Sequence, residues 1–213
     1  MNADCVKKIL VAEDHPLVLM GIQQTIEEIL PGSTVSKADN FPKALKLLGT
    51  ENFDMMIMDI NIPGGDKVSM IEAIRLKQPA LPVLVNSSYD EQLYALPFLK
   101  AGANGFISKT APNREFKNAI DAVLKGKVYA SSSVLQNAFS LLANPGSSND
   151  HVTSKLTDKE LEIAKLLSKG MSTKAISESL NLSSSSISNY KTRIFDKLGV
   201  GNVIELTTYF ELN

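Results

Sequence analysis

The stretch MMIMDINIP at residues 55–63 consists of a short apolar run that ends in an aspartate, Asp59. A short, nearly continuous apolar run with polar neighbours is typical of a strand that is buried on both faces of a parallel sheet. The stretch KILVAED at residues 8–14 has the same form and ends in the acidic pair Glu13 and Asp14. Because open α/β sheets bind ligands outside the carboxyl ends of their strands, both ends are candidate parts of one site.

Residues 8–125 alternate strand-like and helix-like segments, which is the pattern of βαβ units and a parallel sheet. The expected strands cover residues 9–12, 34–38, 55–58, 83–86 and 105–108. The expected helices cover residues 16–30, 41–48, 67–77, 90–101 and 112–125, each ended by a glycine or proline. Pro97 lies inside the fourth of these helices, so we expect that helix to be irregular. The predicted fold class is α/β, with a flavodoxin-like five-stranded parallel sheet.

The composition is that of a globular protein, with 44% hydrophobic and 21% charged residues among 213. A lone cysteine, Cys5, excludes an internal disulfide framework and is consistent with a reducing cytoplasm. The N-terminus shows no apolar signal region, and no apolar run is long enough to cross a bilayer, so we expect no membrane association. The net charge of −1 does not indicate nucleic-acid binding, which must therefore depend on where the basic residues lie.

The C-terminal part of the chain has a helical pattern. Residues 126–150 are rich in serine, asparagine and glycine and predict a linker, with a short helix over 134–142. Three helices are then expected, over residues 157–168, 172–180 and 183–197, followed by a fourth over 203–212. The first begins with a capping box formed by Thr157 and Glu160. This order predicts a small all-α domain that contains a helix-turn-helix.

The strand-end carboxylates suggest metal-assisted phosphoryl transfer. In a flavodoxin-like sheet the first and third strands are neighbours, so Glu13, Asp14 and Asp59 should converge and repel one another unless a cation lies between them. Mg²⁺ suits such oxygen ligands and also accepts a phosphate oxygen. Asp59 would then be the nucleophile that forms an acyl phosphate, while the ammonium group of Lys109 offsets charge on the transferring group.

Two further residues could carry a signal away from this site. Ser87, at the end of the fourth strand, could donate a hydrogen bond to a phosphoryl oxygen, and Phe106 could rotate inward into the space that Ser87 leaves. Taken singly, each of these residues has an ordinary explanation as a helix cap, a structural hydroxyl, a core ring or a solvated charge. Their joint placement at successive strand ends favours the functional interpretation.

The helix expected over residues 183–197 is the predicted DNA-reading element, because the last helix of the helix-turn-helix should enter the major groove. Asn189 can pair bidentately with adenine, and Ser188 and Thr192 lie on the same polar face. Basic residues and N-terminal hydroxyls of the helix are expected to contact phosphates, which fixes position but not sequence. These residues are Lys191, Arg193, Lys197, Ser183 and Ser184. For any single one of them, a solvated helix face is the alternative.

Residues 8–125 resemble the receiver domain of bacterial two-component response regulators, through AEDHP at 12–16, MDINIP at 58–63 and GANGFISK at 102–109. The resemblance implies phosphorylation of Asp59 by a sensor histidine kinase. It also implies that the backbone carbonyl of Asn61 joins the three carboxylates as a Mg²⁺ ligand. Ser87, Phe106 and Lys109 correspond to the family's switch and anchor residues.

The segment LTDKELEIAKLLSKGMSTKAISESLNLSSSSISNYKTRIFDKLGV at 156–200 is similar to the LuxR-type helix-turn-helix of NarL/FixJ response regulators. The expected domains are therefore a phospho-receiver at 1–125, a linker at 126–150 and a DNA-binding domain at 151–213. The resemblance implies promoter DNA as a partner, and a homodimer at least when the chain is phosphorylated or DNA-bound. RNA polymerase is a further candidate partner, and self-phosphorylation with self-dephosphorylation would be the chain's only catalysis.

The sequence departs from the family pattern at several positions. Lys67 replaces a frequent glycine, Asn86 is polar in an otherwise apolar strand, and Pro97 interrupts a helix that often carries the signal. In the expected DNA-binding domain, Thr173, Ser184, Ser185 and Tyr190 also depart from the family's common residues, which leaves the operator sequence open.

Two other functions are considered. A phosphohydrolase with a strand-end aspartate would need a second carboxylate two residues later, where this chain has Asn61. An interaction module that ignores phosphate would bind DNA equally well with or without a phosphodonor.

Overall fold

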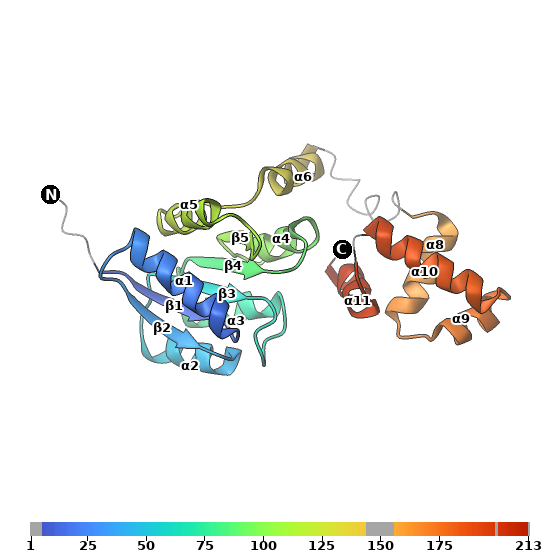
Figure 1. The fold of residues 1–213 in the computed structure, drawn as a ribbon, viewed down its shortest axis with the longest axis horizontal. Coiled ribbons are helices and arrows are strands. Elements are labelled where there is room, and N and C mark those ends of the chain that lie inside the picture. The colour runs from blue at the N-terminus through green and yellow to red at the C-terminus, as the bar shows by residue number, and fades with distance from the viewer. Residues whose placement is uncertain (1–5, 144–155, 199, 213) are drawn as a thin grey trace. The chain divides into compact units, whose positions relative to one another are not determined.

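The computed structural model of the protein describes residues 6–143, 156–198 and 200–212. The chain divides into two compact units, with the boundary between Gln136 and Asn137. Figure 1 shows the helices and strands of both units.

The first unit is built on a parallel sheet of five strands in the order β2-β1-β3-β4-β5. The strands are β1 Lys8–Ala12, β2 Thr34–Ala38, β3 Met55–Asp59, β4 Val83–Ser87 and β5 Gly105–Ser108. In the register of the sheet, Asp59 pairs with Asn86, and Ser87 pairs with Ser108. The predicted fold class is confirmed, and the chemically active residues lie at one edge of the sheet.

Five helices cover the two faces of this sheet (Figure 1). They are α1 Pro16–Ile29, α2 Phe41–Thr50, α3 Ser69–Lys77, α4 Glu91–Lys100 and α5 Asn113–Leu124. Helices α1 and α5 pack on one face, where Ile22, Ile26 and Phe116 meet core residues of the strands. Alternate strand residues point to opposite faces, so β4 contributes Leu84 to this core and directs Ser87 to the other face.

Among helices α1 to α5, two ends differ from the sequence prediction by more than one residue. Helix α2 passes through Gly49 and ends at Thr50, because the backbone at Gly49 keeps a negative φ, and glycine alone weakens a helix without ending it. Helix α3 begins at Ser69 and not at Lys67, because Lys67 has a φ of 43° in the left-handed region. A side chain makes that conformation costly for any residue other than glycine, by about 1 kcal/mol.

Helix α4 is continuous through Pro97, so the expected irregularity does not interrupt the helix. Proline removes one hydrogen bond of the backbone ladder at this point. The helix nevertheless continues because Phe98, one residue later, is fully buried, and Ala101 donates a hydrogen bond to the Pro97 carbonyl at 3.0 Å. Tertiary packing therefore outweighs the local preference.

The predicted linker begins with ordered structure. Tyr129 is bound to the edge of β5, because its carbonyl accepts a hydrogen bond from Phe106 N at 3.0 Å and its own N–H donates to Asn104 O at 2.9 Å. Helix α6 Ser132–Ala143 follows and includes the short helix expected at 134–142. Residues 144–150 of the predicted linker lie outside the described residues.

The second unit contains the four predicted helices. They are α8 Asp158–Ser168, α9 Thr173–Leu180, α10 Ser184–Leu198 and α11 Val203–Leu212. The capping box is present, with Thr157 and Glu160 bonded reciprocally. Ser172 caps α9, which ends at Asn181 with a φ of 55°. The sequence pattern therefore predicted these helices and both caps correctly.

The core of the second unit forms where α10 packs on α8 and α9, and α11 packs on α8. Ile187, Ile194 and Leu198 are buried as expected, whereas Tyr190 is only half-buried. In α11, Leu206 and Tyr209 are buried. Among the residues that the structure describes, no helix combines the length and the apolar character that crossing a membrane requires.

Candidate functional site

Carboxylates from the ends of β1 and β3 meet at the edge of the sheet. Glu13, Asp14, His15 and Asp59 each place one ligand atom within 4.8 Å of the others. Glu13 and Asp59 are buried, at 2% and 4% exposure, while Asp14 is partly exposed. The predicted convergence of the three carboxylates therefore occurs, and it produces a concentration of negative charge that needs a counter-charge.

Lys109, just after β5, supplies part of that counter-charge. Its Nζ lies 2.7 Å from Glu13 Oε2 and 2.9 Å from Asp59 Oδ2. Burial alone lowers the pKa of Lys109, but the nearby Glu13 and Asp59 carboxylates, with a hydrogen bond to Asp59, outweigh it and raise the pKa above its usual value. The ammonium group therefore stays charged beside the acid that would accept a phosphoryl group.

The donor set fits a hard divalent cation. Among the described residues, Glu13 Oε2 and Asp14 Oδ1 are buried and accept no hydrogen bond of good geometry. Each has a cationic or potentially cationic neighbour, since Lys109 lies 2.7 Å from the first and His15 Nδ1 lies 2.9 Å from the second. The close cationic neighbours and the missing hydrogen bonds are compatible, because an ion pair needs only proximity whereas a hydrogen bond also needs direction. Buried oxygens of this kind can ligate Mg²⁺.

The other predicted residues of this site lie close by. Asn61 N donates to Asp59 Oδ1 at 3.3 Å, which fixes the loop after β3. Ser87 is fully buried, and its Oγ accepts a hydrogen bond from Tyr89 N at 3.0 Å. Phe106 is also fully buried, with its ring centroid 6.1 Å from that of Phe98. An inward Phe106 is therefore the arrangement that this structure contains.

Two residues near the site were not singled out from the sequence. His15 follows the acidic pair directly, and its Nδ1 lies 3.0 Å from Glu13 Oε1. Glu91, at the first position of α4, accepts a hydrogen bond from Ser108 N at 2.8 Å. His15 belongs to the AEDHP motif, so the motif contained a signal that could have identified it. Nothing in the local sequence pairs Glu91 with Ser108, seventeen positions later.

The exposed face of α10 carries the predicted DNA-reading residues. Ser188, Asn189, Thr192 and Arg193 are exposed, as base or phosphate contacts must be. A hollow of about 180 Å³ is lined by Ser186, Asn189, Tyr190 and Arg193. An amide and a guanidinium group therefore share one concave surface, which suits hydrogen bonding to a base edge or a phosphate.

The serines at the start of α10 are engaged with one another. Ser183 Oγ accepts a hydrogen bond from Ser186 N at 3.1 Å and thus caps the helix. Ser184 Oγ lies 3.3 Å from Ser177 Oγ of α9. Within the helix, Ser188 and Thr192 donate to backbone carbonyls one turn earlier. These hydroxyls retain their lone pairs and can still accept a hydrogen bond from a base.

The basic residues of α10 differ in how they are held. Lys191 Nζ lies 5.3 Å from the centre of the Phe195 ring, a cation–π contact that leaves its donors open to a phosphate. Lys197 Nζ instead binds Glu160 Oε2 at 2.7 Å. Lys197 therefore has to give up part of this ion pair to contact DNA, and its predicted phosphate contact has the weakest support of the three.

Replacing Glu160 with alanine is expected to lower the free energy of unfolding of the second unit by about 1 to 2 kcal/mol. The substitution removes the hydrogen bond from Thr157 N to the Glu160 carboxylate and the ion pair with Lys197. Hydrogen bonds from Lys197 and Thr157 hold the pKa of Glu160 below its usual value. Its contribution is thus full above about pH 4.3 and is lost as the pH falls through the lower folded pKa.

Hydrogen exchange of α8 amides in the full chain measures this effect. Glu162→Ala is the matched control, since Glu162 forms an exposed pair with Lys159 on the same helix. Equal losses from the two variants at neutral pH would contradict the assigned role of Glu160.

The architecture and the sites define the class of protein. A doubly wound sheet with carboxylates and a lysine at its strand ends, followed by a helix-turn-helix unit, is the organisation expected of a DNA-binding regulator with a phosphate-accepting site. Comparison with known families agrees. Residues 9–121 match the response regulator receiver domain, and residues 154–210 match bacterial regulatory proteins of the luxR family. The chain therefore belongs to the response regulators with a LuxR-type DNA-binding domain, which are transcription regulators and not classical enzymes.

Known relatives share this two-part organisation. The chain is 31% identical over 204 residues to the Fimbriae Z protein of Escherichia coli strain K12, and the alignment covers 96% of each chain. It is 26% identical to RcsB from Salmonella enterica serovar Typhimurium bound to promoter P1flhDC in the presence of phosphomimetic BeF₃⁻, with a TM-score of 0.67. That comparison covers 97% of this chain and 98% of RcsB. A structure of two RcsB dimers bound to two parallel DNAs matches with the same identity, coverage and TM-score.

Proposed function

We propose that phosphorylation of Asp59 by a sensor histidine kinase changes the dimerisation and the DNA affinity of this regulator. The observation that carries the proposal is the buried arrangement of Asp59, Glu13 and Lys109, with the lysine ammonium 2.9 Å from Asp59. The phosphohydrolase considered from the sequence is not supported, because the family is one of transcription regulators.

In the proposed reaction, a carboxylate oxygen of Asp59 attacks the phosphorus of a phosphohistidine. An O–P bond forms, the N–P bond breaks, and the donor histidine leaves with the bonding electron pair. Mg²⁺ bound by Glu13, Asp14, Asp59 and the Asn61 carbonyl would supply positive charge to the phosphoryl oxygens. The chain would catalyse only this self-phosphorylation and a slow hydrolysis of its own acyl phosphate.

The Lys109 ammonium then has a direct role. It loses part of its pairing with Asp59 Oδ2 when that carboxylate becomes an acyl phosphate, and it pairs instead with a phosphoryl oxygen. In the unphosphorylated structure the Ser87 hydroxyl accepts a hydrogen bond from Tyr89 N. The hydroxyl can also donate a hydrogen bond to another phosphoryl oxygen. Movement of Ser87 would disturb the β4 and β5 ends and hence the Ser108–Glu91 bond to α4.

The output is sequence-specific binding of promoter DNA through α10. Asn189 and Arg193 line one hollow, which supports base and phosphate contacts there. The RcsB structures contain dimers on DNA, and by analogy we propose that this chain binds as a homodimer. We place it in the cytoplasm, with RNA polymerase as a further partner. The proposed division of the chain is a receiver at 1–125, a linker at 126–150 and a DNA-binding domain at 151–213.

The proposed function is tested by selecting binding sites from random DNA and measuring affinity with and without a small phosphodonor and Mg²⁺. Coupling between sites is typically 1 to 3 kcal/mol, so phosphorylation is expected to change the affinity of the wild type about 5- to 150-fold. The Asp59→Asn variant should show no such change. Equal wild-type affinities in the two conditions would favour the phosphate-independent interaction module.

A further inference from the structure

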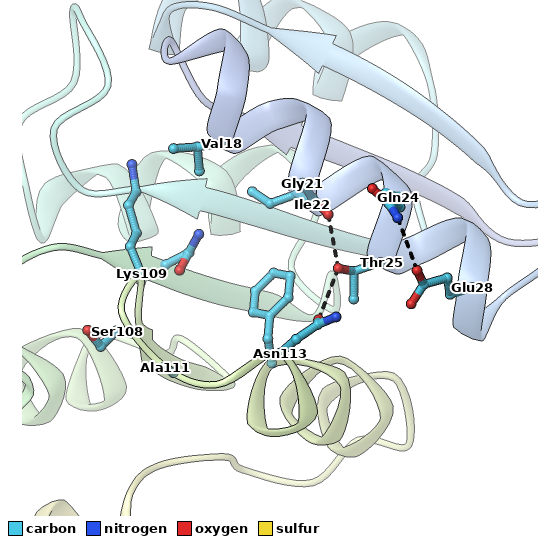
Figure 2. A pocket seen from close by; sticks show the side chains of 12 residues that line it. Val18, Gly21, Ile22, Gln24, Thr25, Glu28, Ser108, Lys109, Ala111 and Asn113 are labelled. Carbon is cyan, nitrogen blue, oxygen red and sulfur yellow. Dashed lines mark hydrogen bonds between the residues drawn. The ribbon is translucent and has the colours of Figure 1, made fainter.

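A pocket beside the acidic site lies between α1 and α5, near the carboxyl ends of β4 and β5 (Figure 2). Its volume is about 370 Å³. Figure 2 shows Val18, Thr25 and Gln24 of α1 on one side and Asn113 of α5 on the other. Lys109 lines the pocket through its stem, while its ammonium group binds the two acids described above. The pocket can therefore be occupied without displacing a group of the acidic site.

One buried polar side chain in the lining, Asn86, has a carbonyl oxygen with no hydrogen-bond donor among the described residues. Asn86 is only 4% exposed, and its Oδ1 accepts no hydrogen bond from any described residue. It lies on the same face of β4 as Leu84, which belongs to the apolar core, and it lines the pocket. Folded proteins rarely bury a carbonyl oxygen without a donor. The unpaired Oδ1 of Asn86 therefore leaves an acceptor in the pocket lining that a ligand donor or a bound water can satisfy.

The α1 side of the pocket includes a glycine, Gly21, in place of a side chain. Gly21 lies inside α1 and lines the pocket, yet a Cβ added there would have no atom within 4 Å. An alanine would fit and would favour the helix, so the absence of a side chain costs helix stability without relieving a clash. Within α1, Thr25 Oγ1 donates to Gly21 O at 2.9 Å (Figure 2). The same oxygen lies 3.2 Å from Asn113 Oδ1 of α5 (Figure 2).

The charges of the lining favour an uncharged ligand. Glu28 is paired with Lys117 at 2.7 Å, and Lys109 is paired with Glu13 and Asp59. The remaining contacts are apolar, from Val18, Ile22, Ala111 and Phe116, or are uncharged hydrogen-bonding groups. A carboxamide such as that of Asn86 pairs with a group that offers an N–H beside a carbonyl.

We propose that this pocket binds a small neutral ring compound with an amide-type edge, as in an aromatic carboxamide or a nucleobase. The amide edge pairs with Asn86, and the ring packs against Phe116 and Val18. This ligand site goes beyond the proposed phosphorylation and DNA binding, and phosphate labelling of Asp59 does not depend on it.

The test is an NMR titration of the full chain with nicotinamide and uracil as the two probes. Both should shift the Asn86, Thr25 and Asn113 signals in a saturable way. Nicotinate, which has the same ring but an anionic carboxylate without an N–H, should bind about tenfold more weakly, because its edge lacks the donor that Asn86 needs. Binding by only one of the two neutral probes identifies the ligand class.

Two variants locate the site. Asn86→Leu, which removes the amide at similar size, and Gly21→Leu, which fills the pocket, should each weaken probe binding about tenfold or more. Gly49→Leu is the matched control, since Gly49 also lies in a helix with nothing within 4 Å of an added Cβ. Thermal melting of each variant verifies folding, and Gly21→Leu keeps the test valid should Asn86→Leu fail to fold.

Several results would overturn the proposal. One is a wild type without saturable shifts at millimolar probe, and another is equal binding of nicotinamide and nicotinate. Unchanged binding by a folded Asn86→Leu or Gly21→Leu variant would do the same. If neither probe binds but Gly21→Leu slows phosphotransfer from a kinase and not from a small phosphodonor, the pocket receives a partner's side chain instead.

Discussion

Replacing Asp59 with asparagine is expected to abolish phosphate incorporation from a small phosphodonor. An amide is not a nucleophile at phosphorus under these conditions, so no acyl phosphate can form. In the wild type, chelation of Mg²⁺ should also suppress labelling, because Glu13, Asp14 and Asp59 would otherwise repel the incoming phosphoryl oxygens. The measurement is retention of radioactive phosphate, followed by its release in mild base as expected for an acyl phosphate.

Asp121→Asn is the matched control for this experiment. The Asp121 side chain is 61% exposed and pairs with Lys125 one turn later, so its loss should leave labelling unchanged. Labelling that persists in Asp59→Asn would mean that another group accepts the phosphate, and Asp14 or His15, within the same cluster, would be the first to examine.

Replacing Asn189 with alanine should weaken binding to the selected DNA site by about 1 to 3 kcal/mol and relax the choice at one base pair. The reason is that a carboxamide can donate to and accept from adenine at once, and alanine can do neither. Asn189 is exposed on α10 and lines the hollow beside Arg193, so truncation removes no packing contact of the core. Binding assays on the selected site and on its single-base variants measure both effects.

Lys191→Gln provides the contrast with base reading. It should weaken binding to all sequences alike and reduce the slope of log affinity against log salt by about 1, because one phosphate contact is lost. Lys165→Gln on α8 is the control for loss of a positive charge outside α10. If Asn189→Ala weakened every sequence equally, Asn189 would be a backbone contact and not a reader of bases.

Much of the fold could be read from local patterns because each pattern has a local cause. Nearly continuous apolar runs indicated β1, β3 and β4, the alternation of strand-like and helix-like segments indicated β2 and β5, and capping residues such as Thr157 and Ser172 indicated helix starts. Convergence of Glu13 and Asp59 followed from chain order, since parallel strands end at one edge of the sheet. The end of α2 was predicted two residues too early, because a single glycine such as Gly49 weakens a helix without ending it. The strong local preference of Pro97 against helix is overridden by packing in α4.

The sequence by itself determined the class of fold, the strand ends that carry the acids and the helix that we propose reads DNA. Only the tertiary structure decided which partners the side chains take: Lys109 with two acids, Lys197 with Glu160, and Asn86 Oδ1 with no donor among the described residues. Strand and helix periodicity is a property of neighbouring residues. Side-chain pairing depends instead on sheet register and on how each helix is rotated against its neighbours, which the packed core sets as a whole.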